Sequence, residues 1–315
     1  MLELHFINVG DGDAALMEYT GPGGPWRLLV DTGREDVGTF PGSRRTTAAD
    51  YLRRRGVTRL DALVVTHLHI DHFGGLARLL DEVELGCVVS GFFPCLPVVG
   101  AARTGTEEKT VRGLLECLEA WAEDTARLTA LGVPLCPAEG ASLVLPAPDG
   151  LVVEVIQPDP EAGALQRRAW RELLAGGPTD APMVWWSAKY RNPGSLRVRL
   201  TYAGRRAELA GDCYGVAWED AAEGCDILKV PHHGDIKAVT PELAARLRPA
   251  YAVVSCGAEY IQRKDRPSRE MARLLAEQGT RVWYTDCFSP PGGTPRYWDS
   301  ADFTIREDGS LLAPE

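Results

Sequence analysis

The stretch "VVTHLHIDHFGG", residues 64–75, holds three of the six histidines of the chain and follows an apolar run. In an extended segment, side chains two residues apart point the same way, so His67 and His69 can reach one cation. If a helix begins just after them, Asp71 and His72 lie in its first turn and can face a second cation. Imidazole and carboxylate groups suit zinc, manganese or iron. Because a buried cluster of such groups is costly without a metal, this stretch predicts a metal site.

Two later segments end predicted strands with groups of the same kind. "ELAGDCYG", residues 208–215, places Asp212 at a strand tip, and "DILKVPHHGD", residues 226–235, places His232 and His233 at another. A strand-end aspartate is commonly a turn residue, and a histidine pair can belong to a polar loop, so neither segment decides the matter alone. Together with the first cluster they predict a two-metal site. Two ions roughly 3.5–4 Å apart can generate a hydroxide and stabilise the oxyanion of a hydrolysed ester.

The composition excludes several classes of protein. No apolar run in the 315 residues approaches the roughly 20 residues of a membrane helix, and the first residues lack the basic region of a signal peptide. The eight cysteines contain no CxxC pair, which disfavours zinc knuckles and a disulfide framework. We therefore expect a cytoplasmic protein with reduced thiols and no membrane association.

The formal net charge of −10 disfavours a wide surface that coats nucleic acid, because such a surface would be basic. A substrate that carries phosphate is not excluded, since bound cations invert the local field whatever the net charge.

The order of predicted elements favours an α+β protein. Strand-like runs come first, strand and helix patterns then alternate, and the alternation returns after residue 195. This order predicts an αβ/βα four-layer sandwich in a single domain of residues 1–315. The pattern loosens over residues 94–190, which we interpret as a helical insertion that decorates the core and carries specificity. Within it, we interpret "MVWWSAKY", residues 183–190, as a packed strand, with a pocket lining as the alternative.

These motifs, together with "NVGDGDAALME" and "LLVDTG" upstream, resemble the metallo-β-lactamase fold. More narrowly, the chain resembles the soluble hydrolase domain of the competence protein ComEC and its free-standing relatives. The "VGDGD" start and "RNPGSLRVRL", residues 191–200, match this ComEC-like subgroup in particular.

The resemblance implies a role for each residue of the site. Metal one would be held by His67 and His69, metal two by Asp71, His72 and His233, and both by Asp212. The candidate catalytic residues are Asp71, Asp212 and His232, of which His232 would face the substrate or metal one. Asp31 would orient a ligand imidazole by accepting its other N–H, and Asp13 could act in the same way.

The chain also departs from the family pattern. Many relatives have a further metal-one histidine, but no histidine lies between His72 and His232. Arg266 stands where ComEC-like chains often have a histidine, and Lys264 lies near it. Such cations could clamp a phosphate, and Asn192 and Ser195 are further candidates for phosphate binding.

The favoured function is that of a metal-dependent phosphodiesterase or nuclease with two divalent ions, zinc or manganese, with iron as a further option. Its hydroxide, activated by the two metals, would attack phosphorus. A short single strand of nucleic acid or a nucleotide-like small molecule fits the acidic chain better than a long duplex. Two alternatives stay open: a hydrolase of a carboxylic ester, lactone or lactam, and a non-catalytic subunit that binds metal and a partner.

Overall fold

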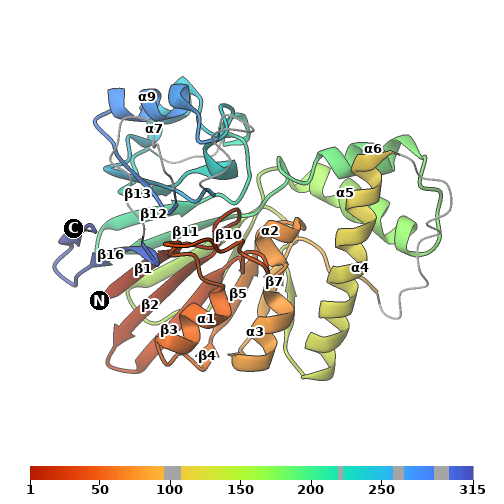
Figure 1. Cartoon of the computed structure of the whole chain (residues 1–315), viewed down its shortest axis with the longest axis horizontal. Helices are drawn as coiled ribbons and strands as arrows, with labels where there is room; N and C mark the ends of the chain where they lie inside the picture. Colours follow the sequence, from red (N-terminus) through yellow and green to blue (C-terminus); the bar gives the residue numbers. More distant parts are fainter. Residues whose placement is uncertain (96–107, 219–222, 258–265, 287–297, 315) are drawn as a thin grey trace.

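Two β-sheets pack face to face, and helices cover the outer face of each sheet (Figure 1). The computed structural model describes residues 1–95, 108–218, 223–257, 266–286 and 298–314. The predicted αβ/βα four-layer sandwich is confirmed.

The first sheet has eight strands, of which β3, β5, β7 and β8 run parallel to one another. In spatial order they are β17 (Leu311–Leu312), β16 (Ser300–Ile305), β1 (Leu2–Ile7), β2 (Ala15–Gly21), β3 (Gly24–Val30), β5 (Ala62–Val65), β7 (Val88–Ser90) and β8 (Leu135–Pro137). A small separate ribbon pairs β4 (Arg59–Leu60) with β6 (Glu84–Leu85).

The second sheet has seven strands, of which β12 to β15 are parallel. In spatial order they are β15 (Arg281–Tyr284), β14 (Tyr251–Val254), β13 (Ile227–Lys229), β12 (Arg205–Leu209), β11 (Arg197–Tyr202), β10 (Leu151–Ile156) and β9 (Ser142–Val144). The apolar side chains of the two inner faces form one core, with Phe6, Val64 and Val198 among them.

Helices bury the outer faces of the sheets. The first sheet is covered by α1 (Ala48–Arg54), α2 (Ile70–Phe73), α3 (Leu76–Glu82), α4 (Lys109–Ala130), α5 (Pro160–Leu174) and α6 (Pro182–Lys189). The second is covered by α7 (Pro241–Leu247) and α9 (Arg269–Glu277).

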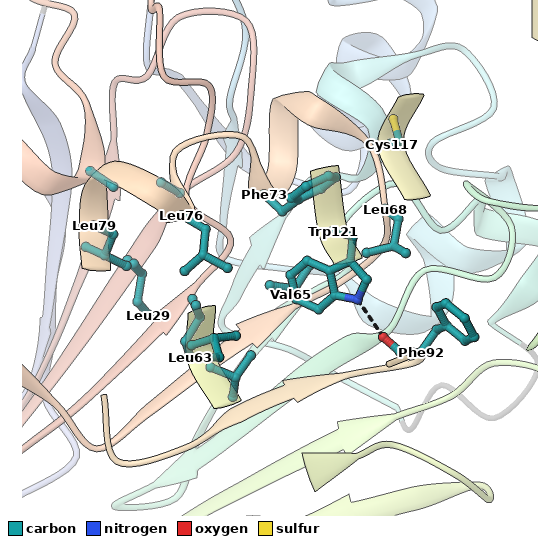
Figure 2. Close-up of a cluster of buried hydrophobic side chains, with 14 of the residues drawn as sticks. Leu29, Leu63, Val65, Leu68, Phe73, Leu76, Leu79, Phe92, Cys117 and Trp121 are labelled. Atoms are coloured by element: carbon teal, nitrogen blue, oxygen red, sulfur yellow. Dashed lines mark hydrogen bonds between the residues drawn. The ribbon is translucent and has the colours of Figure 1, made fainter. Parts of the chain in front are cut away.

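Trp121 of α4 anchors the helical layer over the first sheet. Its ring is fully buried beside Phe73, and its Nε1–H donates to the carbonyl oxygen of Phe92 at 2.8 Å, so the polar tip of the indole is satisfied (Figure 2). Burying an aromatic ring of this size contributes about 2–3 kcal/mol. The packing holds α4 against the end of the sheet that carries α2.

The segment 94–190 contributes to both sheets and to the helical layer. Its β8 pairs with β7 of the first sheet, and its β10 pairs with β11 of the second, whereas α4, α5 and α6 lie together at one side of the sandwich (Figure 1). The interpretation of "MVWWSAKY" as a strand is wrong, because this stretch forms α6. Pro182 begins the helix, where its missing N–H is not needed.

The carboxyl ends of the parallel strands meet at one edge of the sandwich. The chain leaves β5 at Val65, β12 at Leu209 and β13 at Lys229, and each exit leads into one of the motifs singled out from the sequence. Ligand sites of α/β sheets gather at such ends because the loops converge there.

Asp124 of α4 offers a pH test of the helical layer. Burial raises the pKa of this partly buried carboxyl to about 7, although nearby Arg127 opposes the shift. The carboxylate is therefore less favourable in the folded than in the unfolded protein, so its contribution to stability is lost as the pH rises from about 4 to about 7. Asp124→Asn is expected to raise the free energy of unfolding more at pH 8 than at pH 5, as measured by urea denaturation. The exposed Asp180→Asn serves as control, and an equal gain at both pH values would contradict the expectation.

Candidate metal centre

The loop after β5 and the loop after β12 bring three ligand groups together. The ring nitrogens His67 Nε2 and His69 Nδ1 are 2.8 Å apart, and His67 Nε2 is 3.7 Å from Asp212 Oδ2. One ligand atom from each residue lies within 4.8 Å of the other two. The alternation of the extended segment, with Leu68 turned into the core, aims both imidazoles at the same point.

A second group lies beside the first. Asp71 and His72, in the short helix α2, meet His233 from the 3-10 turn η2 (Pro231–Gly234) after β13. The distance between His233 Nε2 and Asp71 Oδ2 is 3.4 Å.

Asp212 lies between the two groups. Its Oδ1 is 3.3 Å from His72 Nε2 and 3.9 Å from His233 Nε2, while its Oδ2 faces His67. One carboxylate therefore has an oxygen directed at each group, which is the arrangement needed to bridge two cations.

The histidine pair is held in an unusual backbone conformation. His232 and His233 have φ of 50° and 54°, in the left-handed region that non-glycine residues rarely adopt. Such conformations gather at functional sites, where the surrounding structure enforces them. Gly234 follows with φ of 77°, and a Cβ there would lie 2.9 Å from Pro267 Cβ. The glycine of the H-H-G motif is thus required by both conformation and space.

Asp31 holds His72 from behind. Its Oδ2 accepts from His72 Nδ1 at 2.7 Å and from the Thr66 hydroxyl at 2.8 Å, and its Oδ1 accepts from the Thr66 backbone N–H at 2.8 Å. The bond to Nδ1 fixes the tautomer and leaves Nε2 directed at Asp212.

Asp13 lies behind both histidines of the second group. Its carboxylate is 3.7 Å from Nδ1 of His72 and 3.7 Å from Nδ1 of His233, and it accepts a hydrogen bond from the buried Lys229. Lys229 went unnoticed in the sequence because a lysine at the end of a strand usually points into solvent. Its ammonium also reaches the carbonyl oxygen of Gly211 at 3.4 Å, so it links the loops after β1, β12 and β13.

Three histidines are neutral. Burial, with neighbouring imidazoles, lowers the pKa of His67 well below its ordinary value. Burial and the charge of Arg191 lower the pKa of His69 to about 3, and burial lowers that of His232 to about 4. Their ring nitrogens are therefore available as lone-pair donors at neutral pH.

The other two histidines of the cluster have pKa shifts in the opposite direction. Burial opposes the charged form, but Asp212 and Asp31 raise the pKa of His72 well above its ordinary value. Asp212 and Asp71 raise that of His233 in the same way. Conversely, the imidazoles hold the pKa of Asp71 and of Asp212 well below the usual range in spite of burial.

The cluster fits divalent cations. Within the described residues, His72 Nε2 and Asp212 Oδ1 are buried polar atoms without a hydrogen-bond partner, and they point at one another. An unpaired buried polar atom normally costs about 1–3 kcal/mol. A cation beside these two atoms would satisfy both, and imidazole with carboxylate suits zinc, manganese or iron.

The cluster opens into a cavity of about 790 Å³. Asn192 and Arg266, two of the predicted phosphate-binding residues, line it. Ser195 does not, because its side chain is fully buried and its hydroxyl accepts from the backbone N–H of Asp212 at 3.3 Å. Lys264 lies outside the described residues. Asn192 donates from Nδ2 to His232 Nε2 at 2.9 Å, and the His232 imidazole also lines the cavity.

Asp31→Asn is expected to weaken metal binding while the chain still folds. Asparagine tolerates the left-handed conformation of this position, where φ is 59°, but it lacks the charge that holds the proton on His72 Nδ1. Loss of such a partner lowers metal affinity by about 10–100-fold. Zinc affinity measured against a chromogenic chelator tests this, with the exposed Asp81→Asn as control. Equal affinities of wild type and Asp31→Asn would show that Asp31 does not orient the imidazole.

The two face-to-face sheets, the outer helices and the cluster at the strand ends define a metallo-β-lactamase fold. The model of the metallo-beta-lactamase superfamily, a superfamily of metal-dependent hydrolases, matches residues 20–85. The resemblance inferred from the motifs is confirmed.

The narrower resemblance is confirmed by a match to "ComE operon protein 3" of Bacillus subtilis (strain 168). The two sequences are 23% identical over 299 residues, which cover 90% of this chain and 32% of the relative. The chain thus spans about a third of the length of that relative. No helix of the described residues is long and apolar enough to cross a bilayer, and the cytoplasmic location stays a prediction.

Solved structures with a similar fold include Igni18, a metallo hydrolase from Ignicoccus hospitalis. It is 14% identical, with a TM-score of 0.47 over 97% of this chain and 100% of that one. Human tRNase Z, short form, is 13% identical, with a TM-score of 0.40 over 99% of each chain.

Proposed function

We propose that the protein is a metal-dependent phosphodiesterase that acts on a short single strand of nucleic acid or on a nucleotide-like small molecule. The observation that carries the proposal is Asp212, which lies between two groups of ligand atoms at the wall of an open cavity. The proposed ligands are His67, His69 and Asp212 for one cation, and Asp71, His72, His233 and Asp212 for the other.

Two bound zinc or manganese ions, or iron, would supply an activated nucleophile and would offset the negative charge that develops on the phosphoryl oxygens. The protein's own part is to place and hold the ligands. Asp31 and Asp13 fix the orientation of His72, and the left-handed turn fixes His233. Because each ligand is held from behind, little reorganisation is needed at the moment of reaction.

His232 is the candidate for proton transfer. It faces the cavity, its ring is neutral, and Asn192 donates to its Nε2. This hydrogen bond places the ring proton on Nδ1, and it occupies the Nε2 lone pair until a reacting group displaces the Asn192 amide. A neutral imidazole within reach of a reacting group can accept a proton from it.

The charge of the cavity favours an anionic substrate over a neutral ester. Its lining contains five basic residues, namely Arg34, Lys109, Lys189, Arg191 and Arg266. Apart from the proposed ligands Asp71 and Asp212, the lining has a single acidic residue, Glu116. Such a wall attracts phosphate, although the chain as a whole is acidic.

Hydrolysis of bis(p-nitrophenyl) phosphate and of single-stranded DNA, with Mn²⁺, Zn²⁺ or Mg²⁺ added in turn, tests the proposal. We expect cleavage that depends on the metal and that Asp71→Ala abolishes while the circular dichroism spectrum is unchanged. A chromogenic cephalosporin and p-nitrophenyl acetate provide the comparison with carbonyl substrates. Hydrolysis of these two without cleavage of either phosphodiester would replace the proposal with a carbonyl hydrolase, and full activity of Asp71→Ala would refute the two-metal site.

A further inference from the structure

The insertion helices place three cations on one wall of the cavity. Lys109 begins α4, Lys189 ends α6, and Arg191 lies two residues after the end of α6. All three line the cavity, together with His69 and Asp71 of the metal cluster. The chain has five lysines in total, so two of them lie on this wall.

These three cations differ from the other cations of the cavity because, within the described residues, no carboxylate forms an ion pair with them. Arg34 lies 3.7 Å from Asp11, and Arg266 lies 2.9 Å from Asp235. By contrast, none of Lys109, Lys189 and Arg191 has a carboxylate at ion-pair distance among the described residues. A chain of net charge −10 has ample acidic residues to pair with them.

Arg191 is the buried member of the wall. Its Nε donates to the carbonyl oxygen of Ala188 at 3.2 Å, and its Nη1 donates to that of Leu68 at 3.2 Å. These acceptors are neutral, so they hold the guanidinium in place without cancelling its charge. Since Leu68 stands between His67 and His69, Arg191 lies beside the metal cluster.

The two lysines lie farther out along the same wall. Both are exposed, and the Lys189 ammonium lies 5.6 Å from the centre of the half-exposed Trp185 ring, a cation–π contact. The nearby Glu108 attracts Lys189 only at longer range, without an ion pair, and its carboxylate accepts from the backbone N–H of Val111 at 2.8 Å, which caps α4. In the part of the chain that the structure describes, the lysines are therefore exposed and can meet an anion at the cavity mouth.

We propose that Arg191, Lys189 and Lys109 form a phosphate-binding wall, and that the substrate carries a second phosphate next to the phosphodiester that is cleaved. This inference rests on the proposed function for the identity of the cleaved bond. Arg191 binds the phosphate nearest the metal cluster through Nη2, because its Nε and Nη1 already donate to backbone carbonyls. The lysines bind the neighbouring phosphate as point charges. A single small diester leaves the lysines unoccupied.

The experiment compares two ligands that a phosphodiesterase does not cleave, thymidine 5′-phosphate and thymidine 3′,5′-bisphosphate. Isothermal titration of the purified protein gives a dissociation constant for each ligand. The ratio of the two constants, monophosphate over bisphosphate, is the advantage that the second phosphate provides. We expect the bisphosphate to bind about tenfold more tightly to the wild type, as one added charge-assisted contact provides. Lys109→Ala/Lys189→Ala should reduce this ratio to about one. The matched control, Arg168→Ala/Arg273→Ala, removes two exposed cations of α5 and α9 and should leave the ratio unchanged.

Equal binding of both ligands to the wild type, or a ratio that survives in the lysine variant, would overturn the phosphate wall. The outcome does not depend on catalysis. If the bisphosphate advantage is found and lost as expected while bis(p-nitrophenyl) phosphate is not hydrolysed, the wall is supported and the proposed reaction fails. If hydrolysis is found without the advantage, the reaction is supported and the wall fails. The ratio should also shrink as salt is raised, because the lysines are exposed to screening.

Discussion

Asp212→Asn is expected to abolish hydrolysis and to lower the metal content of the purified protein from two equivalents to one or none. The substitution keeps the size of the side chain and removes its charge. Among the described residues, Asp212 is the carboxylate with an oxygen facing each group, 3.3 Å from His72 and 3.7 Å from His67. We expect a fall in kcat/KM of about a thousandfold or more, the loss seen when one electrostatic stabiliser of a reaction centre is removed.

Metal content by mass spectrometry and hydrolysis of bis(p-nitrophenyl) phosphate would be measured on the same preparation. Asp226→Asn is the control, because Asp226 forms an ion pair with Arg205 just before β13 and lies outside the cluster. Circular dichroism shows whether both variants fold. Two equivalents of metal and wild-type hydrolysis in Asp212→Asn would mean that the carboxylate does not bridge the cations.

The residues of the metal cluster could be predicted from the sequence because the information is local. The spacing of His67, His69, Asp71 and His72 follows from how strands and helix starts orient side chains, so a few residues suffice. The later motifs at Asp212 and His233 could be added because each follows a short apolar run that predicts a strand. The two-sheet arrangement followed from the order of elements, which restricts the possible layers.

Unlike Asp31 and Asp13, the supporting residues Arg191 and Lys229 could not be predicted, because their roles depend on contacts between distant parts of the chain. Arg191 bonds to Leu68 across 123 positions, and Lys229 reaches Asp13 across 216. Nothing near either residue in the sequence distinguishes it from an ordinary surface cation. Ser195 shows the opposite error, since a hydroxyl beside the cavity loop proves to be buried under Asp212. The helix α6 was missed because its run of aromatic residues suits a strand equally well.

Gly12→Ala is expected to lower hydrolysis strongly although it changes no ligand side chain. The glycine belongs to the "VGDGD" motif, whose Asp13 backbone N–H donates to the carbonyl oxygen of Asp71 at 3.1 Å. A Cβ at Gly12 would lie 2.5 Å from that same oxygen, so the alanine methyl must push the backbone of Asp71 away. Because the contact is with backbone, no side-chain rotation can relieve it. His72 is the next residue, so both ligands move together.

A displacement of about 1 Å in a reacting group costs about a hundredfold in rate, and we expect a loss of that size in kcat/KM for Gly12→Ala. Gly23→Ala is the matched control, since a Cβ there meets nothing within 4 Å and its backbone is not left-handed. Circular dichroism and thermal unfolding would separate a misplaced loop from an unfolded chain. Wild-type hydrolysis in Gly12→Ala would show that the Asp71 loop can move without harm. A loss of hydrolysis in that variant alone would explain why a glycine stands between the two aspartates of the motif. This glycine lies 59 residues before Asp71, the residue that it positions.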